Sequence, residues 1–527
     1  MDYQRIIEDL RKDVAAHPIS VNLVYPDEVY VGIHQADFNK MCLWLYKRLR
    51  SPVMMFFAVD ERKTAQVFVL YCAFMSVEFQ KWFFVHVQLL QESPFFNSIS
   101  KEVHSAHLFE REIKEMFGIE PLGNSDTRRL NLHDEVWPEG FYPLRKDFNN
   151  LLQPAAEKKE YNFKRVEGEG VFEIPVGPVH AGIIGPGHFR FSVAGEPIIN
   201  LEIRLGWTHR GVEKIFEGRD IFKAVGLSER VCGDAAFAHS LAFCQAAEKL
   251  GNIRVPEEHL CLRGIFLELE RMYNHAADIG GIAIDAGFSY PGMYASVIKE
   301  KILQLNAGLT GSRYLKGVNA IGGVTKELDS GSRDKLLITF ESVREDFVNL
   351  KEMLYSSVSF MDRVDDTGVL RKKTAEDLGV VGLAARASGI SLDLRKIFPG
   401  IYGKVNFKLV KQEKGDVLAR LTVRIEEFME SIELIKQFVS KLQSSKAQAL
   451  SKMQVKEGFA LGYVEGWRGP VLYWLKIDKS GLIERCKIVD ASFHNWRGLS
   501  YAVLGNIIPD FPLCNKSFDL SYAGNDL

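Results

Sequence analysis

Residues 416–443, DVLARLTVRIEEFMESIELIKQFVSKLQ, carry the clearest helical pattern in the chain. Apolar side chains recur along this stretch at steps of three, four or seven residues, which places them on one face of a helix. These side chains are Leu421, Ile425, Phe428, Ile432, Ile435 and Leu442. Because such a stripe is typical of core packing, we expect a long buried helix inside a mainly helical domain.

Strand patterns lie on both sides of this helical region. Hairpin-like sequence runs from Val171 through Glu202, and three further strands are predicted at 460–465, 471–477 and 482–489. Turn sequences at 466–470 and 478–481 separate the last three strands. We therefore expect residues 171–527 to form one large, mainly helical domain with β-hairpin elements at its start and in its C-terminal part.

The first 148 residues have the pattern of a separate, small α+β domain. A helix is expected at the start, strands at 66–74 and 81–90, and a second helix at 108–117 that stops at Gly118. Residues 149–170 are polar and poor in core-forming side chains, which is typical of a linker. The expected fold class of the whole chain is α+β, in two domains.

Composition narrows the classes of partner and compartment. The 527 residues include 66 basic and 68 acidic side chains, a balance that gives no electrostatic footprint for nucleic acid. Seven cysteines are scattered singly without any Cys-x-x-Cys pair, which favours a reducing, cytoplasmic compartment. The apolar stretches are shorter than the roughly 18 residues that span a bilayer. We expect no transmembrane helix and, where a membrane is involved, a peripheral position.

Cys232 and His239 form the first candidate site. Cys232 precedes an Ala/Phe/His/Leu run that is predicted to be helical. The N-terminus of a helix favours a thiolate, which can act as a metal ligand or a nucleophile. The alternative is that Cys232 is a small buried hydrophobic residue and His239 a structural histidine.

A family resemblance begins at these residues. Residues 229–239 (ERVCGDAAFAH), which follow the segment 209–214 (HRGVEK), resemble the first metal-binding motif of nickel–iron hydrogenase large subunits. Residues 177–190 (GPVHAGIIGPGHFR) look like the first hairpin of the membrane-bound, energy-converting (group 4) branch, which is homologous to the 49 kDa subunit of respiratory complex I. Further similar segments lie at 263–275, 311–323, 384–389 and 517–527.

The first domain resembles a second complex I subunit. Residues 109–119, 126–130 and 143–147 are similar to the 30 kDa subunit. The fusion of a 30 kDa-like and a 49 kDa-like module in one chain resembles formate-hydrogenlyase-type large subunits. The resemblance assigns docking between subunits to the charged residues of the first module, with a solvated surface patch as the alternative. These residues are Glu110, Arg111, Glu112, Arg128, Arg129, Arg145 and Lys146.

The sequence departs from the family at the metal ligands. The resemblance implies a nickel–iron centre held by four soft thiolates, two from each of two Cys-x-x-Cys motifs. Only Cys232 is retained, because Ala235, Ser521 and Gly524 stand at the other three positions. We therefore predict no intact nickel–iron centre and no hydrogenase activity. We assign no other cofactor to this chain, leave quinone binding open, and expect an iron–sulfur cluster in a partner subunit.

The resemblance implies a coupling role. We expect the large subunit of a complex I-like oxidoreductase that couples electron transfer from a small iron–sulfur subunit to proton or ion translocation by membrane-embedded subunits. It would lie peripherally on the cytoplasmic face of the inner membrane. Glu213, His180, Asp234 and His239 are the candidate catalytic residues. Glu213 matches the glutamate that shuttles protons in hydrogenases, a task for which a burial-raised pKa is suited.

Four charged residues within 263–278 share one face of a predicted helix. Glu268, Arg271, His275 and Asp278 follow each other at i, i+3, i+7 and i+10. One interpretation is a solvated face with ordinary salt bridges. The resemblance favours the other, an internal path of charges for protons or coupling. Arg313, Arg386 and Asp393 are predicted to form structural ion pairs.

Two alternative functions remain open. As a quinone-site subunit of the NADH:quinone oxidoreductase type, the chain would retain the first family histidine as His180. Ile184 and Gly233, however, stand where the second histidine and the tyrosine would be. His188 and Tyr273 are the residues left to replace them. The other alternative is a non-catalytic coupling scaffold that transmits conformational change.

Overall fold

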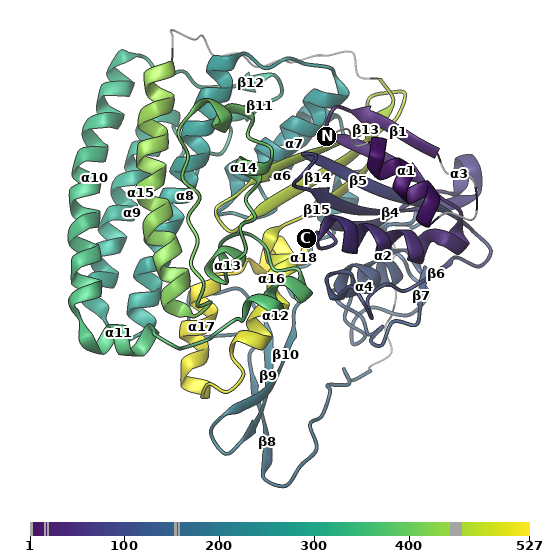
Figure 1. Ribbon diagram of the computed structural model, residues 1–527, viewed down its shortest axis with the longest axis horizontal. Coiled ribbons are helices and arrows are strands. Elements are labelled where there is room, and N and C mark those ends of the chain that lie inside the picture. The colour runs from purple at the N-terminus through teal and green to yellow at the C-terminus, as the bar shows by residue number, and fades with distance from the viewer. Residues whose placement is uncertain (1–3, 15–16, 18–19, 152–154, 156–158, 443–455) are drawn as a thin grey trace.

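The computed structural model describes residues 4–14, 17, 20–151, 155, 159–442 and 456–527. The N-terminal domain lies beside a larger domain that carries a bundle of long helices (Figure 1). The α+β class predicted from the sequence is confirmed. Parts of the predicted linker, 152–154 and 156–158, and Gln443 at the end of the predicted helix lie outside the described residues.

The N-terminal domain is built on a five-stranded sheet. Its order is β1–β2–β5–β4–β3, with β2 and β5 parallel and the other neighbours antiparallel. The strands are β1 (Ser20–Tyr25), β2 (Glu28–Gly32), β3 (Met55–Glu61), β4 (Val67–Ser76) and β5 (Lys81–Leu90). The short strands β6 (Phe95–Asn97) and β7 (Glu120–Leu122) pair separately.

Helices cover this sheet through their apolar faces. Helix α1 (Gln4–Asp13) precedes the sheet, and α3 (Arg62–Ala65) is a short turn between β3 and β4. Helix α2 (Phe38–Leu49) packs on β4 and β5 through Phe38, Met41, Cys42 and Leu45, which recur at helical spacing. Helix α4 (His107–Phe117) packs on β3 and ends at Gly118, whose φ of 66° suits a glycine C-cap. The predicted helix and its stop are confirmed.

Four long helices form the core of the large domain. They are α8 (Glu257–Asp285), α9 (Ser289–Thr310), α10 (Ser330–Ser356) and α15 (Val417–Lys441), and they lie side by side in Figure 1. Asp416 caps α15 by accepting the Ala419 N–H at 2.7 Å. The ring of Phe428 on α15 stacks on Phe347 of α10 at 3.8 Å between centroids. The predicted apolar stripe is therefore a core face.

Short helices connect this bundle to the rest of the domain. They include α5 (Val212–Phe216), α6 (Ile221–Ser228), α11 (Val358–Val364), α12 (Lys372–Leu378), α13 (Gly382–Ala387) and α14 (Leu394–Ile397). The two-residue strands β11 (Asn319–Ala320) and β12 (Gly323–Val324) pair next to α8. The chain closes with α16 (Ala491–Ala502), α17 (Phe511–Phe518) and α18 (Tyr522–Asp526).

A three-stranded antiparallel sheet joins the two domains. It consists of β13 (Gly458–Glu465), β14 (Pro470–Ile477) and β15 (Ile483–Val489) and confirms the three predicted strands. Because side chains alternate along a strand, Tyr473 and Leu475 enter the core of the large domain, while Leu472 and Trp474 enter the N-terminal core. The Trp474 indole donates to the Tyr30 hydroxyl at 3.0 Å. The two domains thus share a continuous apolar contact.

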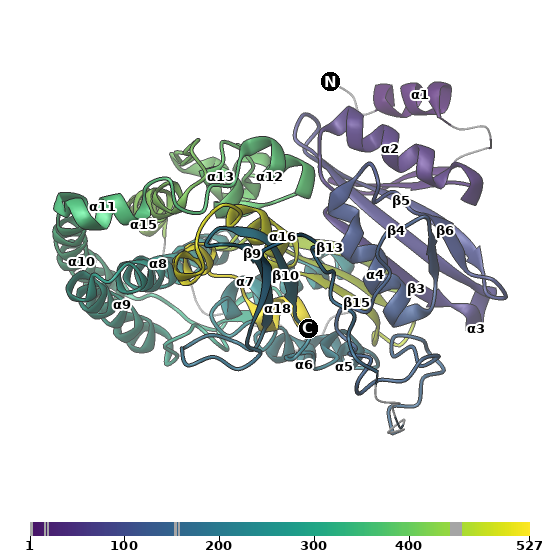
Figure 2. The same cartoon turned by 90° about the horizontal axis from the view of Figure 1, so that it is seen from below.

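The large domain begins with an antiparallel hairpin structure, as predicted. It contains β8 (Val171–Val176), β9 (His188–Ala194) and β10 (Ile198–Arg204), and it extends below the molecule in Figure 1. The loop 177–187 between β8 and β9 carries His180. Seen from below, β9 and β10 lie close to α16 and α18 (Figure 2).

The charged motif residues of the N-terminal domain are bound within the chain. Glu110 is fully buried and accepts hydrogen bonds from Ser98 and the Ile99 N–H. Glu112 pairs with Lys487 at 2.6 Å, and Lys146 pairs with Glu217 at 2.7 Å. The predicted docking role is therefore wrong for Glu112 and Lys146, which bind the large domain of the same chain.

The ion pairs predicted for the large domain are confirmed. Arg313 forms an exposed pair with Glu300 at 2.6 Å. Arg386 and Asp393 are buried and lie 3.5 Å apart.

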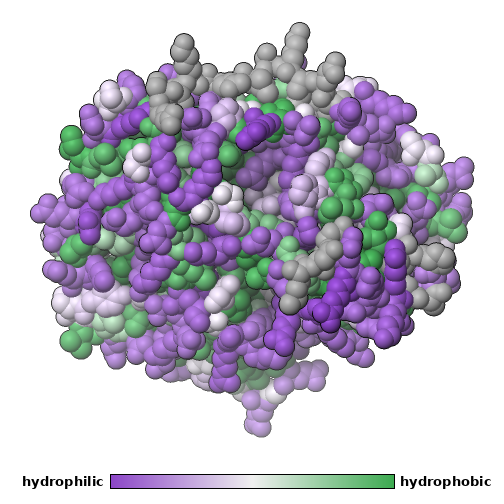
Figure 3. Space-filling view, turned by 45° about the horizontal axis from the view of Figure 1, so that its top comes forward, coloured by the Kyte–Doolittle hydropathy of each residue, from purple (hydrophilic) through white to green (hydrophobic). Residues whose placement is uncertain are grey.

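Hydrophilic residues cover most of the face shown in Figure 3, with hydrophobic residues scattered between them. Within the described residues, no helix combines the length and the apolar character that crossing a membrane requires.

Candidate functional site

Three segments that are distant in sequence converge at Cys232. They are the loop before α7 (Ala236–Leu250), the turn 466–469 between β13 and β14, and the C-terminal segment 517–527. The Cys232 thiol donates to Asp234 Oδ1 at 2.9 Å, and its Sγ lies 3.0 Å from Ser521 Oγ. Ala235 packs against Cys232 in a small buried cluster with Trp467. The Gly524 N–H donates to Ser521 Oγ at 2.8 Å. The structure thus brings together the four positions that the family motifs align.

Arg468 fills the centre of this site. Its guanidinium donates to both carboxylate oxygens of Asp234, at 2.8 and 2.7 Å, and to Asp519 Oδ2 at 3.2 Å. It also lies 3.5 Å from Cys232 Sγ and stacks on the Trp467 ring at 3.8 Å. Arg468 was missed in the sequence, where the segment 466–470 indicated only a turn. Its partner Asp234 lies 234 positions away, and no spacing rule connects the two.

A close backbone contact holds Arg468 in place. A Cβ at Gly382 would lie 2.0 Å from the Arg468 carbonyl oxygen and 2.4 Å from Gly469 Cα. Helix α13 therefore approaches the turn more closely than any other residue type would allow. The turn and its guanidinium are fixed by packing as well as by hydrogen bonds.

The donor set does not fit a nickel–iron centre. Burial, together with the negative charge of Asp234, raises the pKa of the Cys232 thiol well above its usual value. The residue is a thiol, not the thiolate considered from the sequence, and α7 begins only at Ala236. Position 235 offers a methyl group and position 524 no side chain. A Cβ at 524 would lie 2.9 Å from the Asp490 carboxyl carbon, so that carboxyl occupies the space of a side chain.

His239 is fully buried between two polar partners. It contacts Asp490 Oδ2 at 3.1 Å and the Tyr473 hydroxyl at 3.0 Å. Asp490 also caps α16 by accepting the Ser492 N–H at 2.7 Å. Burial opposes the ionisation of Asp490, but the hydrogen bond and the charge of His239 lower its pKa to about 2. His239 is thus a satisfied core histidine that also borders the site through Asp490.

The predicted charged stripe on α8 is entirely internal. Glu268, Arg271 and His275 are fully buried and Asp278 is 3% exposed, so the interpretation as a solvated face is wrong. Glu268 pairs with Arg271 at 3.1 Å, and Asp278 pairs with Arg424 at 2.9 Å. Buried charges persist only when they are paired and hydrogen-bonded, and these are.

Glu427 on α15, which the sequence did not reveal, is the hub of this buried network. It lies 2.8 Å from Arg386, 3.0 Å from His275 and 3.7 Å from Arg271. Further ion pairs and one hydrogen bond extend this network beyond Glu427. They are Arg386 with Glu465 at 2.8 Å, Arg395 with Asp393 at 2.8 Å and with Glu268 at 3.2 Å, and the Tyr402 hydroxyl with Glu268 at 2.6 Å.

The network ends at a cavity between the two domains. The cavity has a volume of about 680 Å³, and Arg395, Tyr402 and Glu465 line one side of it. Tyr25 and Gln80 contribute from the N-terminal domain. A line of buried ionisable groups therefore lies between the surroundings of Cys232 and this cavity. Ion pairs and hydrogen bonds connect its members from His275 to the cavity, and the charge of Arg424 acts on His275 from the other side.

Three buried carboxyl groups have a pKa near neutrality. Burial and the charge of Asp519 raise the pKa of Asp278 to about 7. Burial and the charge of Asp393 raise that of Glu465 to about 7. Burial raises that of Glu270 to about 8, although Glu270 accepts the Phe237 N–H at 2.7 Å and the Ala238 N–H at 3.0 Å. Groups of this kind can gain and lose protons under physiological conditions.

The raised pKa of Glu270 predicts a specific pH dependence of stability. Between about pH 5 and 8 an unfolded glutamate is ionised, whereas folded Glu270 stays protonated. The folded state then binds more protons, so the free energy of unfolding falls as the pH rises, by up to about 1.4 kcal/mol per pH unit. Glu270→Gln is expected to remove the part of this fall that Glu270 contributes, while Asp278 and Glu465, whose pKa values are raised to about 7, keep theirs. Denaturant unfolding of both proteins at pH 5, 6, 7 and 8 measures it. Parallel pH profiles would contradict the assignment.

Glu213, on α5, binds cationic residues of β15. It is buried, pairs with Arg485 at 2.7 Å and with Lys487 at 3.2 Å, and accepts the Ile488 N–H at 2.9 Å. Burial alone would raise its pKa, but the charges of Arg485 and Lys487 lower it. The expected raised pKa of Glu213 is therefore wrong. Burial raises the pKa of Tyr473, and the charges of Asp490 and Glu213 raise it further, so that hydroxyl lies in the field of both carboxylates.

His180 lies at the edge of the site. Its Nε2 contacts the Gly187 carbonyl oxygen at 2.8 Å, and a Cβ at Gly185 or Gly187 would come within 2.7 Å of the Tyr522 ring. The 177–187 loop thus packs beside the C-terminal segment. Among the contacts of the described residues, none joins His180 to Cys232 or Asp234.

Tyr273 and His188, the two residues considered as quinone ligands, lie in different parts of the structure. The Tyr273 hydroxyl lies in the site, where it donates to the Asp234 carbonyl at 3.3 Å. His188 contacts the Gly177 carbonyl at 3.3 Å through Nδ1 and stands against the Phe163 ring.

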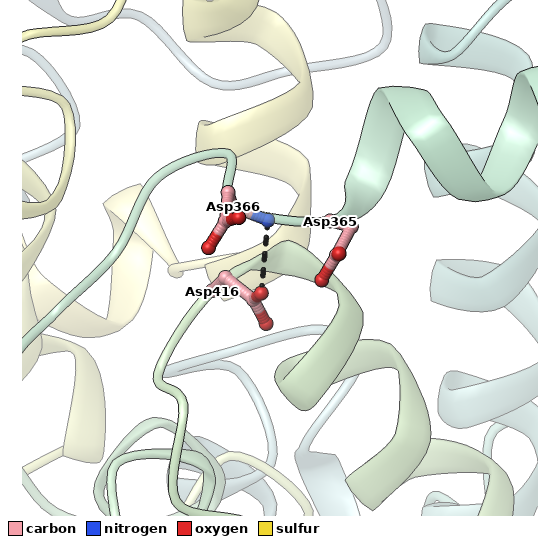
Figure 4. Close-up of side chains that lie close together, drawn as sticks. All are labelled: Asp365, Asp366 and Asp416. Atoms are coloured by element: carbon pink, nitrogen blue, oxygen red, sulfur yellow. Dashed lines mark hydrogen bonds between the residues drawn. The ribbon is translucent and has the colours of Figure 1, made fainter.

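A separate acidic cluster lies at the start of α15. The carboxylates of Asp365, Asp366 and Asp416 lie within 4.8 Å of one another, and Asp416 accepts the Asp366 N–H at 3.0 Å (Figure 4). Lys414 pairs with all three carboxylates. Lys414 thus neutralises part of the cluster's negative charge, and Asp416 caps α15.

Three family models match parts of the sequence. The respiratory-chain NADH dehydrogenase 30 Kd subunit matches residues 31–152, nickel-dependent hydrogenase matches 210–278, and the respiratory-chain NADH dehydrogenase 49 Kd subunit matches 285–454.

Curated relatives match most of the chain. Formate hydrogenlyase subunit 5 of Escherichia coli is 32% identical over 507 residues, which cover 95% of this chain and 89% of that protein. An NADH-quinone oxidoreductase subunit of Phocaeicola vulgatus is 31% identical over 72% of this chain and 76% of that protein. The carbon monoxide-induced hydrogenase of Rhodospirillum rubrum is 31% identical over 66% of this chain and 97% of that protein.

A solved structure has a similar fold. A chain of the archaeal membrane-bound sulfane sulfur reductase matches with a TM-score of 0.64 and 24% identity, covering 68% of this chain and 99% of that one.

Proposed function

Since the chain belongs to the family of oxidoreductase large subunits that includes formate hydrogenlyase subunit 5 and the 30 and 49 Kd subunits of complex I, we propose that it couples electron transfer to proton or ion translocation without an intact nickel–iron centre. Electrons would come from a cluster in a small iron–sulfur subunit. Membrane-embedded subunits would move the ions, and the chain would lie peripherally on the cytoplasmic face of the inner membrane.

The observation that carries this proposal is the buried charged line between the Cys232 site and the 680 Å³ cavity. Its first members are Arg468 and Asp519, whose charge acts on Asp278. Arg424 pairs with Asp278, and its charge acts on His275, which contacts Glu427 at 3.0 Å. A structural core gains little from burying so many ions, because desolvation offsets most of their attraction. The carboxyl groups of Asp278 and Glu465, with a pKa of about 7, can exchange protons, and the arginines, which stay protonated, provide fixed positive charge between them.

The same groups indicate how the chain would respond to an electron. An added negative charge near Arg468 would raise the pKa of Asp278, which already lies at about 7, and draw a proton onto it. That proton would be replaced from the cavity through Glu465, whose pKa is also about 7. Arg468 would hold the charge in place through its fork on Asp234.

Loss of the nickel–iron ligands supports the second part of the proposal, that the chain works without an intact nickel–iron centre. One thiol stands where four thiolates would be needed, and Asp490 takes the space at position 524. The site would therefore serve a charge-compensating role. Metal analysis of the purified complex should find far less than one nickel per chain, and stoichiometric nickel or hydrogen evolution would overturn this part.

Glu213→Gln in the assembled complex is expected to lower turnover by about 100-fold, because it removes a preorganised buried carboxylate that pairs with Arg485 and Lys487 and acts on the Tyr473 hydroxyl. Turnover with the natural electron donor and ion uptake into vesicles are measured together. His180→Ala is expected to act in the same direction. Glu300→Gln, a change in an exposed ion pair, is the matched control with unchanged turnover.

The alternatives give different results in the same assay. A non-catalytic scaffold would keep full turnover in both variants as long as assembly is normal. A quinone site would show oxidation of the reduced complex by added quinone, together with protection of the cavity from labelling. That outcome would replace the proposal by quinone reduction.

A further inference from the structure

A second recess lies between the two domains, away from the buried network. Its volume is about 310 Å³, and it is bounded by α4, the segment 126–130, β10 and α16. The cationic side chains that line it outnumber the anionic ones. The cationic ones are Arg111, Arg128, Arg129, Lys164, Arg204 and Arg497, and the anionic ones are Asp126 and Glu202.

Most of these cations have carboxylate partners. Arg128 pairs with Asp126 at 2.7 Å and with Glu202 at 2.6 Å, and Lys164 pairs with Asp126 at 3.2 Å. Two further pairs lie at the rim. They are Arg204 with Glu135 at 2.6 Å and Arg129 with Asp134 at 3.2 Å.

Arg111 and Arg497 bind backbone carbonyl oxygens instead of carboxylates. Arg111 is 8% exposed and donates to the carbonyl oxygens of Arg128 at 2.7 Å and Arg129 at 2.9 Å. Arg497 donates to the His104 carbonyl at 3.1 Å. Within the part of the chain that the structure describes, neither forms an ion pair with a carboxylate. One comes from α4 of the N-terminal domain and the other from α16 of the large domain.

The pKa values of neighbouring groups show the effect of the positive charge on Arg111 and Arg497. Burial and the charges of Arg497 and Arg111 lower the pKa of His107 to about 3. Burial lowers the pKa of Arg497 itself, so its cation lacks the solvation or the counter-charge that it would have elsewhere. The charge of Asp126 offsets part of this field at His107 and Arg497, but two carboxylates face six cations in the recess.

We propose that this recess binds a small oxyanion, a phosphate or carboxylate group, held jointly by the guanidinium groups of Arg111 and Arg497. Arg111 binds backbone carbonyls through Nε and Nη2 and would contribute Nη1, whereas Arg497 binds the His104 carbonyl through Nη1 and would contribute the other edge of its guanidinium. Hydrogen bonds between charged groups are the stronger ones in proteins. Leu108, Trp496 and Leu504 provide apolar walls for the body of the ligand. A bound anion would connect the two domains through one arginine from each, independently of the chemistry at Cys232.

The test uses the full chain with inorganic phosphate, and with succinate as a dicarboxylate, against sodium chloride at matched ionic strength. Calorimetric titration is expected to show saturable binding of phosphate or succinate but not of chloride. Thermal unfolding in the presence of the bound anion should show a higher midpoint. Phosphate alone would identify a phosphate ligand, and succinate alone a carboxylate ligand. In ¹³C-histidine-labelled protein the bound anion should move the titration of His107 to higher pH, because it offsets the field of the two arginines.

Arg111→Gln and Arg497→Gln are each expected to weaken binding by about tenfold or more, as expected for the loss of a hydrogen-bonded charged partner. Arg497→Lys keeps the charge without the fork, so it should bind with intermediate affinity even where the glutamine variants fold poorly. Arg313→Gln, which alters an exposed pair outside the recess, is the control with unchanged affinity. Binding no stronger than that of chloride, or unchanged affinity in Arg497→Lys and both glutamine variants, would overturn the proposal.

Discussion

Glu427→Ala is expected to lower the free energy of unfolding by about 3–5 kcal/mol, the cost of leaving buried charges without their partner. Glu427 is 2% exposed and lies within 4 Å of Arg271, His275, Arg386 and Arg395. Its removal leaves the three arginines without this carboxylate in a region where water cannot replace it, whereas His275, whose pKa burial lowers to about 4, is neutral. Burial opposes the charge of Glu427, yet Arg386 and its other partners lower its pKa far below the usual value, so the carboxylate is charged throughout the physiological range. Chemical denaturation of the isolated chain measures the loss.

The matched control for this prediction is Glu300→Ala. Glu300 also binds a guanidinium through both oxygens, at 2.9 and 2.6 Å from Arg313, but on the surface. Exposed pairs contribute little because water and salt screen them, so this variant should unfold almost as the wild type does. Glu427→Gln keeps the shape and removes only the charge, and its loss should be intermediate. Equal effects of the buried and exposed substitutions would contradict the assignment of Glu427 as the hub.

Arg468→Ala is expected to lower turnover of the assembled complex by about 100-fold or more, the usual cost of removing one preorganised charge from a buried reaction site. Arg468 is the cation closest to Cys232, and its fork holds Asp234 through two hydrogen bonds. Without it, Asp234 loses its counter-ion and Asp519 keeps only Lys516. Turnover of the purified complex, together with subunit stoichiometry to confirm assembly, is the measurement.

Two further variants separate charge from geometry at this position. Arg468→Lys retains the charge but cannot bind both oxygens of Asp234 and stack on Trp467 in the same way, so turnover should recover only partly. Arg313→Ala removes an arginine from an exposed pair and should leave turnover unchanged. Full turnover of Arg468→Ala in a correctly assembled complex would favour the scaffold alternative over the coupling proposal.

Much of the fold was predictable from local patterns. The stripe from Leu421 to Ile435 predicted α15, and the glycine at 118 predicted the end of α4. The turn residues around 466–470 and 478–481 predicted the boundaries between the last three strands. These features depend on neighbours within one or two turns of the chain. The docking role of Glu112 failed because its partner, Lys487, belongs to a strand 375 residues away.

The site was predictable only as a set of positions. The motifs aligned Cys232, Ala235, Ser521 and Gly524, and the structure places them together. The same motifs gave the wrong direction for the pKa of Glu213, because Arg485 and Lys487 approach from another part of the chain. They gave no indication of Arg468, Glu270 or Glu427.

The sequence by itself determined which atoms are present: the helical and strand periodicities, the two fused modules, and a single cysteine where the family has four. Only the tertiary structure decided what those atoms do. It buried the stripe on α8, placed Arg468 against Cys232, and raised the pKa of Asp278 and Glu465 to about 7. The physical reason is that ionisation depends on solvent exposure and on charges within a few ångströms, and these charges belong to residues that only folding brings together.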